Sequence, residues 1–498
     1  MKKRLLIANR SEIAIRIIRS AHKLGMLAVV FQSDKEPDAL YLKYADEIIP
    51  ARDATTEKPI FLDAERIVNL ALEHNIDLIH PGYGFLSENP DFAALCTENG
   101  INFIGPSATL IREMGLKTVA KSMAIEAGLP LVPGSDGAIN DAEAAKVYAE
   151  KIGYPVLLKA SAGGGGRGMR IVEKPETIER HFKSASDEAL AAFDNGDMFI
   201  EKYLQNPKHI EFQILGDKHG NVIHLGEREC SLQRKHQKLL EEAPSASLTP
   251  EMRKDMGDMA VRFAKKIGYF SAGTIEYILD EDGSFYFMEM NTRIQVEHPV
   301  TEMVSGVDLV DWQIKIALGE VLTLKQEDIK LNGWAIECRV NTEDPQNRFS
   351  PQTGFIDKIH FPHSNDIRIE SGVQSGSVVT PYFDSMIAKI IVHGSNRQET
   401  IEKTLAALYE FSLIGLKTTV PFCRAVLQHP EFVDASYTTR WVDQVYTPEM
   451  LENADDEMIG ALAATIMYAS EYLQLSSDLP SYKNDSLNVW VLNKRLNY

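Results

Sequence analysis

The sequence predicts an α/β fold that passes into an α+β region, and two patterns carry this prediction. Over roughly the first 115 residues, short apolar segments alternate with amphipathic helical segments, as in a parallel sheet covered by helices. From about residue 204, segments of alternating polar and apolar residues follow one another, interrupted by one helical stretch at 251–268. Such alternation is typical of half-buried strands.

The elements of the first region are bounded by apolar runs and glycine. Helices are expected at 12–25, where Gly25 closes the helix, and at 65–75. Strands of the parallel sheet are expected at 5–9, 26–31, 77–82 and 103–107. In the second region, strands are expected at 209–217, 221–230, 272–280 and 284–291.

The end of the chain has a different character. Residues 456–474 carry a helical stripe of apolar side chains at Ile459, Leu462, Ile466 and Leu473. We expect this stripe to pack on the protein itself, and the alternative is a docking helix for a partner.

Composition limits the classes of function. The chain has 498 residues, 44% hydrophobic and 25% charged, which suits a globular protein of two to four domains. Its net charge of -19 argues against nucleic acid or an anionic membrane as the main partner. We find no run of about 18 apolar residues and no signal-peptide pattern. The cysteines lie far apart, which favours reduced thiols and a cytoplasmic protein: Cys96, Cys230, Cys338 and Cys423.

The segment SAGGGGRGM at 161–169 contains G-x-G-x-x-G, the dinucleotide fingerprint. That fingerprint requires a helix after the glycines, but 169–174 is strand-like, as is 154–160 before them. The pattern G-x-x-x-x-G-K-[ST] is absent too. A glycine hairpin remains, whose tip either folds over phosphates or is merely flexible. Lys159, flanked by apolar residues, calls for an anionic partner.

The segment FYFMEMNTRIQVEHP at 285–299 separates polar from apolar side chains with period two. If the strand stays extended, one face carries Glu289, Asn291, Arg293, Gln295 and Glu297. The other face then carries Met288, Met290, Ile294 and Val296. A strand with this division lines a cleft, the alternative being an exposed strand with solvated charges.

A turn at Asp282 and Gly283 joins this strand to the preceding one and brings Glu276 opposite Glu289. Facing carboxylates repel unless a cation lies between them. Hard oxygen ligands suit Mg²⁺ or Mn²⁺.

Further along the same segment, Arg293 and Gln295 supply donors for a small planar oxyanion, and Glu297 could take a proton from it. A basic run precedes this hairpin on an expected loop, where it either neutralises a phosphate or is solvated: Arg234, Lys235, His236 and Lys238.

Taken together, the motifs resemble those of biotin carboxylase, an ATP-grasp enzyme, over roughly residues 1–445. They are IANRSEIAIR, HPGYGFLSEN, FIGPS, KASAGGGGRGM, EKYLQNPKHIEFQILGD, ERECSLQRKHQK, EMNTRIQVEHPVTE, ECRVNTEDP and TPYFDSMIAK. Ser11 stands where the family usually has glycine. We expect little consequence, because serine is a good helix N-cap.

The resemblance implies an ATP-grasp fold with a Rossmann-like N-terminal domain at 1–115. An ATP-grasp domain would span 116–330, with a glycine-loop lid at about 131–203. A mixed-sheet C-terminal domain would span 331–446, followed by a helical extension at 447–498.

The resemblance also implies roles for particular residues on the nucleotide side. The ATP phosphates would be held by Lys117, Lys159 and the backbone of Gly164, Gly165 and Gly166. The adenine would contact Glu201, Lys202 and Leu204. The ribose would be surrounded by His209, Gln233 and His236. Mg²⁺ or Mn²⁺, together with ATP, would be bound by Glu276 and Glu289, with Asn291 as a further metal ligand.

On the carboxylation side, bicarbonate would lie against Arg293, Gln295 and Val296, with Glu297 as the base. Lys238 would bridge bicarbonate to the γ-phosphate, and Tyr83 and Arg339 would meet biotin. The implied reaction forms carboxyphosphate, which breaks to CO₂ and phosphate. The phosphate then deprotonates biotin N1, and Arg339 stabilises the enolate that captures CO₂.

Biotin would be a substrate attached to a separate carrier protein, because the sequence has no Ala-Met-Lys-Met segment. We therefore expect a homodimeric subunit that works with a biotin carboxyl carrier protein and a carboxyltransferase. The final acceptor, such as pyruvate, acetyl-CoA or propionyl-CoA, stays open. The alternatives are another ATP-grasp ligase, such as a carbamoyl-phosphate-forming enzyme, and a catalytically silent nucleotide-binding scaffold.

Overall fold

A computed structural model describes residues 2–51, 58–135, 137–160, 169–193, 196–235, 237–451 and 465–466. The chain forms two compact units, Met1–Tyr446 and Thr447–Tyr498. In the second unit, the described residues are a short 3-10 helix, η7 (Pro448–Leu451), and the helical pair Thr465 and Ile466. The rest of the stripe expected at 456–474 lies outside the described residues. Within the part of the chain that the structure describes, no helix has both the length and the apolar character needed to cross a membrane.

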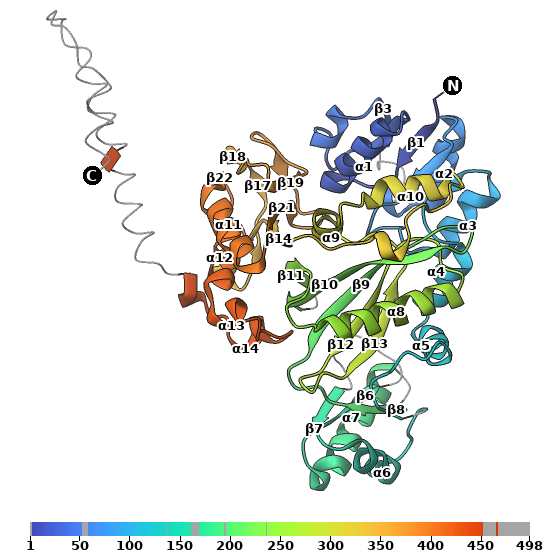
Figure 1. Ribbon diagram of the computed structural model, residues 1–498, viewed down its shortest axis with the longest axis vertical. Coiled ribbons are helices and arrows are strands. Elements are labelled where there is room, and N and C mark those ends of the chain that lie inside the picture. Colours follow the sequence, from blue (N-terminus) through green and yellow to red (C-terminus); the bar gives the residue numbers. More distant parts are fainter. Residues whose placement is uncertain are drawn as a thin grey trace, which may run out of the picture. The chain divides into compact units, whose positions relative to one another are not determined.

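The N-terminal part of the first unit is a parallel sheet, as predicted (Figure 1), but it has five strands, and the one at Glu47–Ala51 was not among those expected. Its strand order is β3 (Glu47–Ala51), β2 (Leu27–Ser33), β1 (Arg4–Ile7), β4 (Leu78–His80) and β5 (Asn102–Phe103). The helices that accompany it are α1 (Ser11–Lys23), α2 (Ala64–Glu73), α3 (Pro90–Glu98) and α4 (Ala108–Gly115).

Both faces of this sheet are covered, which explains the continuous apolar run in β1. Leu5 and Ile7 join a core that contains the apolar face of α1. Leu6 points the other way, into a core built with α2 and α3. Alternate residues of a strand face opposite sides, so a strand between two helical layers has no polar face.

The start of α1 differs from the prediction for Ser11. The N-cap position is Arg10, and no side chain caps the helix there. Ser11 is the first helical residue and has a φ of 60°, in the left-handed region that favours glycine. Ser11 is therefore a strained residue rather than a helix cap. We expected serine at this position to have little consequence because it would cap the helix, and that reason is wrong.

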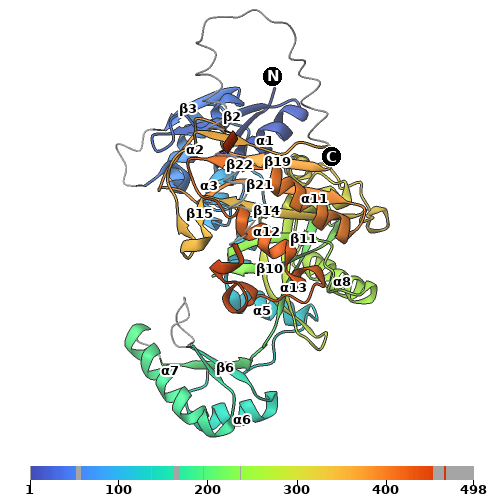
Figure 2. The ribbon, with the colours of Figure 1, turned by 90° about the vertical axis from the view of Figure 1, so that its left-hand side faces the viewer.

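The glycine hairpin belongs to a small three-stranded sheet whose order is β7 (Met169–Val172), β6 (Val156–Ala160) and β8 (Met198–Lys202). β6 pairs with both neighbours in antiparallel fashion. Two helices, α6 (Ala142–Ile152) and α7 (Ile178–Phe193), share one apolar core with this sheet (Figure 2). The strands on both sides of the glycines are thus as expected, whereas residues 161–168, with Gly164, Gly165 and Gly166, lie outside the described residues.

The largest sheet has eight strands in the order β13-β12-β9-β10-β11-β14-β21-β19, and every neighbouring pair is antiparallel. Its strands run over the expected boundary at residue 331. They are β9 (Lys208–Gly216), β10 (Val222–Arg234), β11 (Gln237–Ala243), β12 (Ser271–Leu279), β13 (Phe285–Asn291), β14 (Trp334–Asn341), β19 (Ile367–Ser371) and β21 (Met386–Gly394).

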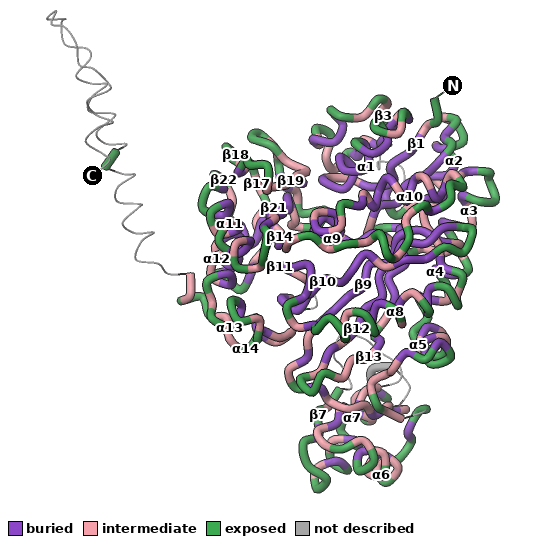
Figure 3. The backbone as a smooth tube through the Cα atoms, in the orientation of Figure 1, coloured by how far each residue is buried: buried purple, intermediate pink, exposed green. Residues whose placement is uncertain are grey.

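The central strands of this sheet are buried along most of their length (Figure 3). On β9, Ile210, Phe212 and Ile214 pack into a core with α8 (Pro250–Lys266). The intervening residues His209, Glu211 and Gln213 are buried too, although they are polar. Buried polar groups need partners, and the partners of this face form the candidate site.

Three further sets of helices complete the first unit. α5 (Lys117–Glu126) precedes the small sheet. α9 (His298–Ser305) and α10 (Leu309–Ala317) follow β13, and α10 shares a core with α1. The last helices are α11 (Arg397–Glu410), α12 (Val420–Gln428), α13 (Pro430–Val433) and α14 (Trp441–Gln444).

Candidate active site

Acidic side chains meet across three neighbouring strands of the eight-stranded sheet. Glu276 on β12 lies opposite Glu289 on β13, as the turn at residues 282–283 predicts. Glu276 also lies opposite Glu211 on β9. Residues directly opposite each other in an antiparallel pair project on the same side. Three carboxylates therefore converge.

The β12–β13 pairing contains a bulge that the alternation of β13 does not predict. Glu276 pairs with Glu289, but Tyr277 pairs with Phe287, so Met288 has no opposite residue. Met288 is 39% exposed, whereas Met290 is buried. The expected apolar face of Met288 and Met290 is thus broken, because an extra residue in one strand changes which side the next residue faces.

β13 ends at Asn291, so the condition that the strand stays extended to Glu297 does not hold. Residues 292–296 form an irregular turn, and Glu297 is the N-cap residue of α9. The expected polar side chains nevertheless stay together. The Arg293 guanidinium donates to Gln295 Oε1 (2.8 Å) and to Asn291 Oδ1 (3.3 Å). Arg293 also donates to Glu88 (2.9 Å).

The basic run lies on a hairpin of two strands rather than on a loop. β10 continues to Arg234, and β11 begins at Gln237. Lys238 consequently points into the site, where its ammonium lies 2.6 Å from Glu211, 2.6 Å from Glu297 and 3.4 Å from Glu276. One buried ammonium thus lies within 3.4 Å of three carboxylates.

The other basic residues of this run are placed differently from Lys238. Arg234 stacks over the Phe349 ring at 4.7 Å. Lys235 occupies the hairpin turn with a φ of 48°. His236 lies outside the described residues.

Glu297 is clamped between two cations. Its Oε1 accepts a hydrogen bond from the Lys238 ammonium, and its Oε2 accepts one from the Arg339 guanidinium at 2.9 Å. Arg339, on β14, also donates to Glu241 on β11 at 2.6 Å. This arrangement brings together Lys238, Glu297 and Arg339, three of the four residues expected to be catalytic. The fourth, Arg293, lies on the turn that leads to Glu297.

The charges around Glu297 shift the pKa values of the carboxyl groups in opposite directions. Burial alone would raise the pKa of Glu297, but Lys238, Arg339 and Arg228 outweigh it and hold the pKa well below its usual range. Burial raises the pKa of Glu241 to about 7 despite Arg339. Burial also raises the pKa of Glu337, which is fully buried. The site therefore keeps Glu297 ionised, and also Glu276, whose pKa is lowered by Lys238 and His209 in spite of its burial.

The residues expected at the nucleotide side lie on β8 and next to it. Lys159 finds its anionic partner in Glu201, which also accepts from Lys121 at 3.1 Å. Lys202 is paired with Asp280 at 3.0 Å. Leu204 is buried.

The residues expected around the ribose and at the adjoining end of the site also come together. Gln233 lies 3.3 Å from the His209 ring nitrogen. Lys117 begins α5, and its charge acts on Glu289.

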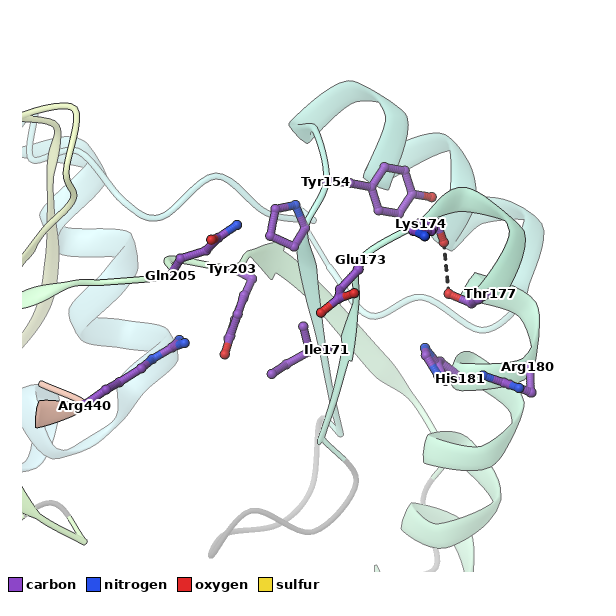
Figure 4. Close-up of a pocket in the computed structure, with 11 residues that line it drawn as sticks. Tyr154, Ile171, Glu173, Lys174, Thr177, Arg180, His181, Tyr203, Gln205 and Arg440 are labelled. Atoms are coloured by element: carbon purple, nitrogen blue, oxygen red, sulfur yellow. Dashed lines mark hydrogen bonds between the residues drawn. The ribbon is translucent and has the colours of Figure 1, made fainter. Parts of the chain in front are cut away.

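A cavity of about 740 Å³ opens beside β8 (Figure 4). Tyr203 and Gln205, which flank Leu204, line it together with Tyr154 and Arg440. Arg440 stacks on Tyr203 at 4.6 Å and donates to the Leu204 carbonyl at 2.8 Å. Arg440, near the end of the first unit, thus contacts the residues directly after β8, where the adenine is expected.

The donor set at Glu276, Glu289 and Asn291 fits a hard divalent cation. The Glu289 side chain has no hydrogen bond or ion pair to any residue that the structure describes, and burial together with the negative charge of Glu276 raises its pKa. Asn291 donates to Glu276 at 2.7 Å. Two facing carboxylates and an amide oxygen are the ligands that Mg²⁺ or Mn²⁺ prefers.

On the carboxylation side, Tyr83 donates its hydroxyl hydrogen bond to Glu12. The Val296 carbonyl accepts from Lys389 at 2.8 Å. Sequence patterns alone did not single out Glu12 and Lys389.

The same is true of a buried group formed by Glu211, Glu241, Glu337 and Arg228. The alternation in HIEFQ could have indicated Glu211, because it places His209, Glu211 and Gln213 on one face. The others depend on strand order, which the sequence does not show.

Two features together indicate an ATP-grasp ligase. One is the small antiparallel sheet whose strands flank the glycine-rich segment. The other is the set of carboxylates that converge from adjoining antiparallel strands around the buried Lys238. Comparison with family models shows which family of this class the chain resembles. Residues 1–111 match "Biotin carboxylase, N-terminal domain", 117–325 match "Carbamoyl-phosphate synthase L chain, ATP binding domain" and 337–444 match "Biotin carboxylase C-terminal domain".

Similar proteins align with this chain over nearly their whole length. The 2-oxoglutarate carboxylase small subunit of Hydrogenobacter thermophilus is 50% identical over 470 residues, which are 94% of this chain and 99% of the relative. Biotin carboxylase 1 of Bacillus subtilis is 49% identical over 444 residues, 89% of this chain and 98% of the relative. A pyruvate carboxylase subunit of Methanothermobacter thermautotrophicus is 44% identical over 487 residues, 97% of this chain and 99% of the relative. The chain belongs to the biotin carboxylase family.

Solved structures agree. The biotin carboxylase domain of a thermophilic 2-oxoglutarate carboxylase bound to bicarbonate superposes with a TM-score of 0.86 at 49% identity, covering 91% of this chain and 100% of that one. The dimer of the Hydrogenobacter thermophilus domain with MgADP, ADP and bicarbonate gives 0.82 at 51% identity, covering 91% and 99%. The predicted ATP-grasp fold is thereby confirmed.

Proposed function

We propose that the chain carboxylates biotin with ATP and bicarbonate, and that Glu297 is the base that deprotonates bicarbonate. The observation that carries this proposal is the position of the Glu297 carboxylate between Lys238 and Arg339. Its depressed pKa keeps it ionised but leaves it a weak base as long as both cations contact it. An anion that enters here competes for both cations, and this competition raises the basicity of Glu297 at the moment of binding.

The remaining residues bind and orient the substrates. Arg293 and Gln295 donate to the bicarbonate oxygens, and the Val296 backbone lies next to them. Lys238 balances the charge that develops as the bicarbonate oxygen attacks the γ-phosphate. Arg339 then stabilises the enolate oxygen of biotin, with Tyr83 beside it. The resemblance to biotin carboxylase implies these roles, and the charges and contacts given above support them.

For the nucleotide, Lys117, Lys159 and the backbone at Gly164, Gly165 and Gly166 hold the phosphates. The adenine and ribose lie along β8 and β9, against Glu201, Lys202, Leu204, His209, Gln233 and His236. Glu276, Glu289 and Asn291 hold Mg²⁺ or Mn²⁺, which neutralises phosphate charge when bound. Lys159 is paired with Glu201, so holding a phosphate would require its ammonium to leave this carboxylate.

The alternative of a carbamoyl-phosphate-forming enzyme has less support. The match to carbamoyl-phosphate synthase covers only the ATP-binding domain at 117–325. The matches on both sides of it are to biotin carboxylase domains.

We also propose that the chain is the biotin carboxylase subunit of a 2-oxo acid carboxylase. The 2-oxoglutarate and pyruvate carboxylase subunits match 94% and 97% of this chain. The methylcrotonoyl-CoA carboxylase subunit of Oryza sativa matches 92% of it, and the Bacillus subtilis biotin carboxylase 89%. A homodimer that works with a biotin carrier protein and a carboxyltransferase follows from this assignment. Four free, buried cysteines suit the cytoplasm that we expect for it.

The assignment of the base is tested by Glu297→Gln, which keeps the shape of the side chain and removes its basicity. We expect bicarbonate-dependent ATP cleavage to fall by about 10²–10⁴-fold, the usual contribution of a general base, while ATP still binds. Glu242→Gln is the matched control, since Glu242 is equally buried on β11 but pairs with Arg397. Equal activity of the two variants would refute the role of Glu297.

A further inference from the structure

Lys389 connects three parts of the first unit that are far apart in the sequence. It lies on β21 and has no exposed surface. Its ammonium donates to the Val296 carbonyl at 2.8 Å and lies 3.2 Å from Glu12 Oε1 on α1. The ring of Tyr83 has its centroid 6.0 Å from the same ammonium.

Glu12 joins the two sides of this contact. Tyr83 donates its hydroxyl hydrogen bond to Glu12 Oε1, the same oxygen that Lys389 approaches. Glu12 Oε2 has no hydrogen-bond partner among the described residues. Tyr83 and Lys389 therefore both hold the carboxylate of Glu12 in place. Loss of the Tyr83 contact would let the carboxylate shift and so change its contact with Lys389.

The Val296 carbonyl matters because of the residue that follows it. The carbonyl of Val296 and the N–H of Glu297 belong to one planar peptide unit, so fixing one orients the other. The preceding carbonyl, that of Gln295, accepts from the ring and the backbone of His298 at 2.8 and 3.4 Å. Lys389 and His298 thus hold successive peptide units of the turn that ends at Glu297.

Charged groups surround Lys389 from each neighbouring strand. Arg339 on β14 and Glu370 on β19 are its direct opposites in the sheet. Glu337 acts on it from β14 as well, and Glu12 from α1. With charged groups on several sides, the buried ammonium of Lys389 has few positions available.

We propose that Lys389 is a positioning residue that couples the biotin side of the site to the bicarbonate side. The path runs from the Tyr83 hydroxyl through Glu12 to Lys389, and from there to the Val296–Glu297 peptide. Through this path, Tyr83 affects the bicarbonate turn without any biotin being bound. The inference rests on the proposed function, because it assumes which substrate each side receives.

The test is the KM for bicarbonate in ATP cleavage measured without biotin. Tyr83→Phe removes one hydroxyl and leaves the ring, so we expect this KM to rise by roughly three- to tenfold, the net worth of one hydrogen bond. If Tyr83 acts on biotin alone, the KM for bicarbonate stays at the wild-type value, and the coupling is refuted. The KM for ATP should not change in either case.

Tyr41→Phe is the matched control. Tyr41 is a buried tyrosine of the same N-terminal region, and its hydroxyl donates to the Phe31 carbonyl at 2.8 Å, outside the path. It should lose comparable stability without any change in the KM for bicarbonate. An equal rise in both variants would show a general loss of stability, and would overturn the proposal.

Lys389→Met gives the second arm. We expect a larger rise in the KM for bicarbonate, and the double variant with Tyr83→Phe should rise no further than Lys389→Met alone, because one path is cut twice. Effects that multiply would mean independent roles and would refute the coupling. If Lys389→Met does not fold, Tyr83→Phe decides alone. A wild-type enzyme without bicarbonate-dependent ATP cleavage would instead refute the proposed function itself.

Discussion

A single methyl group at Gly372 should destabilise the chain, and the reason lies in Ser11. Gly372 follows β19, and its backbone N–H donates to the Ile387 carbonyl at 3.0 Å. A Cβ built on Gly372 would lie 2.0 Å from Ser11 Oγ, 2.9 Å from the Glu12 nitrogen and 3.0 Å from Ser11 Cα. Two of these three neighbours are backbone atoms. Gly372→Ala therefore forces the first turn of α1 to move.

The cost is steric, because the backbone of Gly372 is not in the left-handed region. Overpacking by a methyl group costs about 1–3 kcal/mol, and we expect the upper part of this range here. Ser11→Gly removes the closest atom, Oγ, and also the cost of about 1–2 kcal/mol for a left-handed non-glycine residue. Greater freedom of glycine in the unfolded chain offsets roughly 0.5–1 kcal/mol of that gain.

A double-mutant cycle by thermal and urea unfolding measures this interaction. We expect Ser11→Gly to stabilise the chain by about 0–1.5 kcal/mol. Beyond this gain, the double variant should recover more than about 1 kcal/mol of the loss caused by Gly372→Ala. Gly115→Ala is the control, since its added Cβ meets nothing within 4 Å at the end of a helix. Losses that simply add up would show that Ser11 is not the obstacle and would refute the reasoning.

Two other predictions concern activity and pH. Arg339→Ala should lower biotin carboxylation more than biotin-independent ATP cleavage, because the role we propose for Arg339, on the enolate, comes after phosphate transfer; equal losses would contradict this order. Burial lowers the pKa of His80 to about 3 and that of His224 to about 4. Each unfolded histidine binds a proton below its usual pKa of about 6.5, so acidification from pH 7 to 5 should cost up to about 2 kcal/mol per residue. His80→Gln should reduce this loss in urea titrations, and an unchanged pH dependence would contradict the assignment.

Local patterns were sufficient for the elements that one segment determines. β1 and β2 read as uninterrupted apolar runs because helices cover both faces of their sheet. Glu276 and Glu289 could be paired from the sequence, since a short turn fixes the register on both sides of it. The fold of the two sheets and this half of the site were therefore within reach of the sequence.

The order of the strands in the large sheet could not be predicted from the sequence. The partners of the buried charged residues depend on this order. The basic run that ends at Lys238 was expected on a loop, but Lys238 lies on β11 together with Glu241 and Glu242. Each has a partner: Lys238 has Glu211, Glu241 has Arg339 on β14, and Glu242 accepts from Trp334 on β14. Charge on a central strand looks like solvent exposure until the neighbouring strands are known.

The break in β13 is what allows one base to serve both halves of the site. Six more residues of extended strand would carry Glu297 about 20 Å beyond Asn291. The turn instead returns the chain to the sheet, where Lys238 lies 3.4 Å from Glu276 and 2.6 Å from Glu297. Glu297 then reaches Arg339 on β14 at 2.9 Å. Glu276, on the side proposed for the metal, and Arg339, on the side proposed for biotin, are thus linked through Lys238 and Glu297. Because Glu297 does not belong to a strand, its orientation depends on the contacts that Lys389 and His298 make with the turn.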